Sequence, residues 1–173
     1  MENPYEPPKS DWENPLPKDA PRLFNPTASS MFALLFGLPL ACFLHAANWK
    51  ALGEHKYSTA NIWIGVVWIV LAVGVFVASA VVNGGDMQGN NSIKQSFLIL
   101  GLPALLGWYF GFGRKQEQLV QDIYGKNYPR RSMWWAVLWG LVMSVGIFAL
   151  FFILTIILII LGFIPIETTP PAG

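Results

Sequence analysis

Few side chains of this 173-residue sequence combine reactive chemistry with a place inside an apolar segment. The ten Asp and Glu and the eleven Lys and Arg all lie outside the long apolar runs, which leaves His45 as the one ionisable candidate within them. Two histidines that share a haem must lie on facing helices, and His55 falls in the loop that follows. We therefore expect His45, next to Asn48 and Trp49, to make a packing hydrogen bond.

Other reactive patterns are missing from the sequence. Two His and one Cys, without a His-Glu-x-x-His or Cys-x-x-Cys motif or a cluster of carboxylates, do not match the ligand spacing of a metal site. The glycines do not form a phosphate-binding loop before a Lys, and no Ser stands in a Gly-x-Ser-x-Gly turn. The sequence thus predicts no catalytic, cofactor-binding or metal-binding residues, and no cofactor.

The single cysteine, Cys42, cannot form a disulfide within one chain. We expect it to serve in packing. The alternative is lipidation, because Leu40 and Ala41 precede it as in a lipoprotein cleavage site, although Pro39 stands where a branched apolar residue is usual.

The composition points to lipid surroundings. Hydrophobic residues make up 54% of the chain and charged residues 12%, whereas a soluble domain has about 25% charged residues. The mean hydropathy is +0.45. A net charge of +1 gives no reason to expect nucleic acid as a partner. These values exclude a disordered tail protein and a typical soluble enzyme.

Four apolar segments are each long enough to cross a hydrocarbon core about 30 Å thick. We therefore predict an all-α integral membrane protein with four transmembrane helices, arranged as two antiparallel hairpins, in a domain over 28–164. A helix with one polar face should follow the third segment over 114–124. The predicted spans are about 29–48, 60–82, 96–113 and 133–164.

The chain ends are predicted as tails. Residues 1–27 hold seven prolines, which prevent a continuous helix, and residues 165–173 form a short C-terminal tail. The N-terminal tail is either a flexible extended leader or a docking peptide. In the second interpretation the aromatic anchors for a partner are Tyr5, Trp12 and Phe24.

Charge gives the expected orientation. Seven Lys and Arg lie in the loops 49–59 and 114–132, against four in the N-terminal tail and the loop after the second span. Basic loops stay in the cytoplasm, so four spans would place these two loops inside the cell and both termini outside.

Small residues recur at intervals of about four positions in the apolar segments, as at close contacts between membrane helices. They serve either internal packing or docking against another subunit. The predicted interface residues are Ala33, Gly37, Ala41, Gly74, Ala78, Gly107, Gly111, Ala136, Gly140 and Ser144.

Four short motifs resemble those of a loose group of small uncharacterised multi-pass inner-membrane proteins of bacteria. These are Asn3-Pro4-Tyr5-Glu6-Pro7-Pro8, Leu23-Phe24-Asn25-Pro26, Asn48-Trp49-Lys50-Ala51-Leu52-Gly53 and Ser132-Met133-Trp134-Trp135. The resemblance implies location in a bacterial inner membrane. It implies no activity and no site residues.

Three functions fit these observations. The leading interpretation is a non-catalytic accessory or scaffold subunit of a larger inner-membrane complex, with the lipid bilayer and either other membrane subunits or further copies of itself as partners. The alternative is a small oligomeric channel or transporter, for which Gln95 and Ser96 at the mouth of the third span are the candidate lining. A membrane-embedded enzyme is the second alternative.

Overall fold

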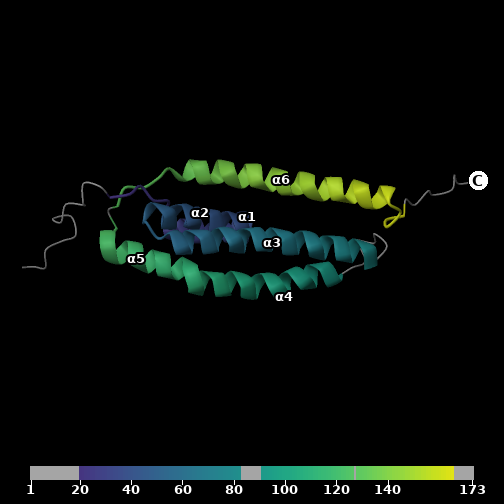
Figure 1. The fold of residues 1–173 in the computed structure, drawn as a ribbon, viewed down its shortest axis with the longest axis horizontal. Helices are drawn as coiled ribbons and strands as arrows, with labels where there is room; N and C mark the ends of the chain where they lie inside the picture. The colour runs from purple at the N-terminus through teal and green to yellow at the C-terminus, as the bar shows by residue number, and fades with distance from the viewer. Residues whose placement is uncertain (1–19, 83–90, 127, 166–173) are drawn as a thin grey trace, which may run out of the picture.

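The chain folds into helices over the residues that the computed structural model describes, 20–82, 91–126 and 128–165. In Figure 1, α6 runs along one side of the elongated bundle and α4 with α5 along the other, with α3 and the short α1 and α2 between them. The elements are α1 (Pro26–Phe36), α2 (Leu38–Ala51), α3 (His55–Val82), α4 (Asn91–Trp108), the π-helical turn η1 (Tyr109–Gly113), α5 (Arg114–Tyr124) and α6 (Met133–Ile160).

Two helices in the described part of the chain, α3 and α6, are long and apolar enough to cross a membrane. Each has 28 residues, which corresponds to about 42 Å at the helical rise. They contain the predicted second and most of the predicted fourth span. Helix α6 stops at Ile160 because Gly162 takes a φ of +78° and the Phe163 N–H turns back to donate to the Leu158 carbonyl oxygen, at 2.9 Å.

The predicted first span, 29–48, is not one helix. It is divided at Gly37, whose φ of +86° and ψ of 162° suit glycine and strain other residues. Helices α1 and α2 then lie antiparallel, so that Phe24 meets Asn48 and Ser30 meets His45. We call this pair the helical hairpin. Its arms measure about 16 and 21 Å, too short to cross about 30 Å of hydrocarbon.

The predicted third span and the polar-faced helix after it form one continuous helical rod, α4–η1–α5, which is bent in Figure 1. Pro103 lies inside α4, and in η1 the Arg114 N–H donates to the Tyr109 carbonyl oxygen, five residues earlier. Helix α5 packs on the chain through Val120, which is buried with Leu23 and Tyr128.

The hairpin is the centre of the packed interior. Ala41 and Cys42 of α2 are fully buried, and an added Cβ on Gly65 of α3 would lie 3.2 Å from the Phe43 ring. On the other side of α2, Leu40 and Leu44 form a second cluster with Ala136 of α6 and with Phe24. Cys42 is a packing residue here, as expected.

Backbone hydrogen bonds tie the start of the described chain to the loop before α6. The Leu23 N–H donates to the Pro129 carbonyl oxygen at 3.0 Å, and the Arg131 N–H donates to the Leu23 carbonyl oxygen at 2.7 Å. Residues 20–24 therefore lie at the same end of the bundle as the two basic loops, and the C-terminal end of α6 lies at the other end (Figure 1). The prediction places both ends of the chain on the face opposite the loops. The described residues 20–24 lie instead beside the loop before α6, because the helical hairpin returns the chain to its starting side. The chain ends themselves, 1–19 and 166–173, lie outside the described residues.

Gly140 of α6 marks the closest approach between α6 and the hairpin. An added Cβ would lie 2.9 Å from both Leu40 Cδ2 and Phe36 Cγ, whereas nothing described lies within 4 Å of the same position on Gly146. We predict that Gly140→Leu destabilises the protein by about 1 to 3 kcal/mol through overpacking. Thermal melting in detergent measures this, and Gly146→Leu is the control on the same helix. Equal melting temperatures for the two variants would contradict the close contact.

Candidate functional site

A group of buried polar side chains joins the helical hairpin to the rod α4–η1–α5. We call it the polar cluster. Burying such groups away from water is costly unless each finds a hydrogen-bond partner. His45 and Gln116 are fully buried, and Asn48 is 1% exposed, so this requirement applies to them in full. The cluster comprises Ser30, His45, Asn48, Tyr109, Gln116 and Glu117.

Asn48 joins the two open ends of the hairpin. Its Oδ1 accepts the Phe24 N–H at 2.8 Å, and its Nδ2 donates to the Phe24 carbonyl oxygen at 2.9 Å. This amide thus satisfies both main-chain groups of Phe24, just before α1 begins. A hydrophobic residue at position 48 would leave both groups without these partners.

Gln116 attaches α5 to the same place. Its Nε2 donates to the His45 carbonyl oxygen at 2.9 Å, and its Oε1 accepts from Asn48 Nδ2 at 3.2 Å. A side chain on a helix with a polar exposed face is therefore used inside, against the last turns of α2. Helix α5 depends on this contact for its position over the hairpin.

Ser30 lies where three elements meet. Its hydroxyl donates to the Pro26 carbonyl oxygen or to Glu117 Oε1, both at 3.1 Å, and lies 3.1 Å from His45 Nε2. The second Glu117 oxygen, Oε2, accepts from the Tyr109 hydroxyl at 3.2 Å. The Glu117 carboxylate thus faces inward between α1 and η1.

The π turn sets the direction of the rod's contacts. Eight residues separate Trp108 from Gln116, which in an uninterrupted α-helix would point them about 80° apart. One extra residue in a π turn reduces this to about 20°, so both side chains face the hairpin and are buried. The Trp108 Nε1–H donates to Asn61 Oδ1 of α3 at 2.8 Å, and its ring meets His45 edge-on, with centroids 5.0 Å apart.

The polar cluster works mainly on the backbone. Asn48, Gln116 and Ser30 each bond a main-chain carbonyl or N–H, which is the pattern of a structural joint. Ser29 Oγ, His45 Nδ1 and Trp49 Nε1 are the buried side-chain atoms without a partner in the described part of the chain. Nor do three or more His, Cys, Asp or Glu side chains gather there around a point that could hold a metal ion.

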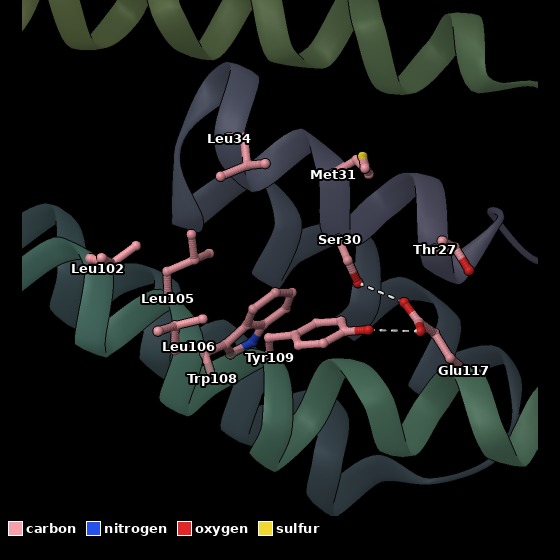
Figure 2. Close-up of a pocket in the computed structure, with 10 residues that line it drawn as sticks. All are labelled: Thr27, Ser30, Met31, Leu34, Leu102, Leu105, Leu106, Trp108, Tyr109 and Glu117. Atoms are coloured by element: carbon pink, nitrogen blue, oxygen red, sulfur yellow. Dashed lines mark hydrogen bonds between the residues drawn. The ribbon is translucent and has the colours of Figure 1, made fainter.

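A groove of about 300 Å³ opens beside the polar cluster, between α1 and the rod (Figure 2). Leu34 of α1 and Leu102 and Leu105 of α4 line one part of it. The other part ends on the Glu117 carboxylate, with Tyr109 pointing toward it along the rod. The groove is therefore apolar along its length and anionic at one end.

The predicted interface residues take several positions. Ala33 and Ala41 are buried in one cluster with Trp108 of the rod, and Ala136 and Gly140 are buried at the contact between α6 and the hairpin. Gly37 is the turn itself, so its positive φ, rather than close helix contact, requires glycine there.

The remaining small residues do not meet another helix of the described chain closely. An added Cβ on Gly74, Gly107 or Gly111 would have no described atom within 4 Å. Gly74 and Ala78 are exposed together on α3. The Ser144 hydroxyl donates within its own helix, to the Gly140 carbonyl oxygen at 2.8 Å.

The predicted tail anchors divide into two groups. Tyr5 and Trp12 lie outside the described residues. Phe24 packs inside this chain, against Leu40, Leu44 and Ala136, instead of being available to a partner, because its backbone is held by Asn48.

Sequence reasoning missed the roles of Asn48, Asn61, Gln116 and Glu117. One sequence pattern could have identified Gln116. It stands four positions before Val120, so the two side chains lie on the same face of α5, and this face is the buried one. Asn48 follows His45 by three positions, but nothing in the sequence links it to Phe24.

No known family model matches this chain, and neither a curated protein nor a solved structure shows significant similarity to it.

Replacing Gln116 tests the polar cluster. We predict that Gln116→Leu destabilises the fold by about 1 to 3 kcal/mol, because the His45 carbonyl oxygen and Asn48 Nδ2 each lose a hydrogen bond to Gln116 while they stay buried. Gln118→Leu, two positions away on the exposed face of α5, should change the stability by less than about 0.5 kcal/mol. Chemical denaturation monitored by tryptophan fluorescence compares the two. A Gln116→Leu protein as stable as Gln118→Leu would remove the cluster's structural role.

Proposed function

We propose that this chain is a non-catalytic accessory or scaffold subunit of a larger complex in a bacterial inner membrane. The observation that carries the proposal is how little of α3 and α6 the chain itself covers. Only 11% and 6% of the residues in their most apolar 18-residue stretches are buried inside the chain. Membrane helices with such free surfaces contact either lipid or other subunits.

The exposed ridge on α3 supports a protein partner. Gly74 and Ala78 present almost no side chain, which allows a second helix backbone to approach closely and gain dispersion contacts. The proline-rich tail, through Tyr5 and Trp12, is the second contact that we propose. The polar cluster supports a non-catalytic role, since Ser30, Asn48 and Gln116 are engaged in holding the main chain together.

The proposed topology has three crossings and a hairpin that enters and leaves on one side. Helices α3 and α6 and the rod segment α4–η1 cross, while α1 and α2 return at Gly37. Arg22 then joins the seven basic residues of the two loops on one face, and Lys94 lies at the start of α4 toward the other. The basic face is cytoplasmic by the positive-inside rule.

Single-cysteine labelling tests this topology on a Cys42→Ser background. With a membrane-impermeant maleimide added to intact cells, Phe163→Cys should react, and Arg22→Cys and Lys126→Cys should react only after permeabilisation. The reason is that the hairpin keeps residues 20–24 on the side of the basic loops. Labelling of Arg22→Cys together with Phe163→Cys in intact cells would contradict the arrangement.

Co-purification tests the function. The tagged full chain, extracted in mild detergent, should migrate on native gels well above its own 19.2 kDa and carry a second membrane protein. Gly74→Leu combined with Ala78→Leu should reduce recovery of that protein about tenfold or more, because leucine prevents close helix approach. Gly146→Leu, which also places a leucine at an exposed glycine but on α6, should retain the partner. Unchanged recovery with the α3 variant would contradict docking there.

A channel or transporter is the second candidate. Helices that break inside the membrane occur in channels and transporters, and the turn at Gly37 is such a break. Its test is solute or ion flux into vesicles that contain the purified chain alone. Flux from a homo-oligomer, without a second protein, would favour this candidate over the accessory subunit.

A further inference from the structure

The groove beside the polar cluster has a polarity that changes along its length. Leu34 lies near the tip of the hairpin, and Leu102 and Leu105 lie opposite it on α4. At the other end the wall consists of Ser30, Tyr109 and Glu117 (Figure 2). Leu102 and Glu117 are 15 positions apart on the rod, about 22 Å at the helical rise. The groove thus has the length and polarity to hold one hydrocarbon chain with a polar group at its end.

The two walls of the groove, α1 and the rod, place their apolar parts at the same level across the membrane and their polar parts at another level. Helix α1 runs from the basic end of the bundle toward the hairpin tip, and the rod runs back in the opposite direction. The apolar part of the groove therefore lies at the level of the hydrocarbon core, and Glu117 lies at the level of the headgroups.

Charge indicates which headgroup fits. No basic side chain in the described residues forms an ion pair with Glu117, whose oxygens accept from Ser30 and Tyr109 and still have free lone pairs. Arg114 is exposed three positions earlier on α5, a spacing that brings side chains onto neighbouring positions of a helix surface. The groove thus offers a carboxylate at its polar end, and the Arg114 guanidinium lies outside the groove lining, one turn earlier on the exposed surface of α5.

We propose that this groove binds one aminophospholipid of the surrounding membrane. The lipid's primary ammonium donates to the Glu117 carboxylate, its phosphate accepts from Arg114, and one acyl chain lies along Leu34, Leu102 and Leu105. A phosphatidylglycerol headgroup has no ammonium, and a choline headgroup has no N–H to donate. The inference rests on the membrane location in the proposed function, but not on the existence of a protein partner.

Photocrosslinking in vesicles tests the proposal. The purified full chain is reconstituted in phosphatidylcholine vesicles that contain a phosphatidylethanolamine with a photoreactive acyl chain, and the labelled peptides are mapped. We expect label on α1 and α4 at the groove. Unlabelled phosphatidylethanolamine should compete for these positions, and phosphatidylglycerol should not.

Two variants and one control separate the headgroup from the chain. Glu117→Gln loses the charge but keeps one acceptor oxygen, so that one of the Ser30 and Tyr109 hydroxyls can still donate and the other must accept from the new amide N–H. This variant should weaken groove labelling about tenfold. Leu34→Trp fills the groove and should abolish labelling without unfolding, because Leu34 is 70% exposed. Asp122→Asn removes an exposed carboxylate of the same helix and should have no effect.

The outcomes distinguish the two proposals. A chain that does not float with the vesicles overturns both, since neither holds outside a membrane. A chain that floats but is labelled equally on α3 and α6, or equally in the presence of phosphatidylglycerol and phosphatidylethanolamine competitors, overturns the lipid site alone. Unchanged labelling of Glu117→Gln overturns it as well.

Discussion

The paired hydrogen bonds between the Asn48 amide and the Phe24 main chain are the constraint on which the rest of the structure depends. A helix that breaks inside an apolar environment leaves main-chain groups that must be satisfied within the protein. The break at Gly37 produces two short helices, and Asn48 closes their open ends. Gln116 then uses the same amide to fix α5, so one side chain sets the positions of three elements.

The π turn and the glycine turn solve related problems in different ways. Gly37 reverses the chain, whereas η1 keeps the direction of the rod and changes which face meets the hairpin. Without the added residue, either Trp108 or Gln116 would point away from its partner. Asn61 and His45 would then lose the indole, or Asn48 and the His45 carbonyl would lose the amide.

The apolar segments with uniform composition were predictable. Helices α3 and α6 follow directly from length and hydropathy, with ends shifted by a few residues. The division of the first apolar segment into two helices was not predictable, because hydropathy does not show where a chain reverses its direction. In addition, Ala33, Gly37 and Ala41 are spaced as on one face of a continuous helix. The backbone angles at Gly37, with Pro39 just beyond, decide between the two structures. The orientation of the N-terminal segment failed for the same reason, since it depended on counting four crossings.

The polar cluster was out of reach of sequence patterns for a different reason. Asn48 and Gln116 are 68 positions apart, and each looks unremarkable beside its neighbours. Only the fold brings them together. His45 was recognised as a residue that makes a hydrogen bond, and Ser30 lies at bonding distance from its ring. Its second contact, the Trp108 ring, required the rod to be in place.

The limited depth of the hairpin gives the molecule unequal ends. Near the basic loops, α1 and α2 stand beside α3, α6 and the rod, whereas beyond Gly37 only the three longer elements continue (Figure 1). In a bilayer the chain would occupy a larger cross-section in one leaflet than in the other. Such a wedge packs best where the leaflet on its broad side is stretched. Within a bilayer, local curvature would therefore favour one position of such a molecule over another.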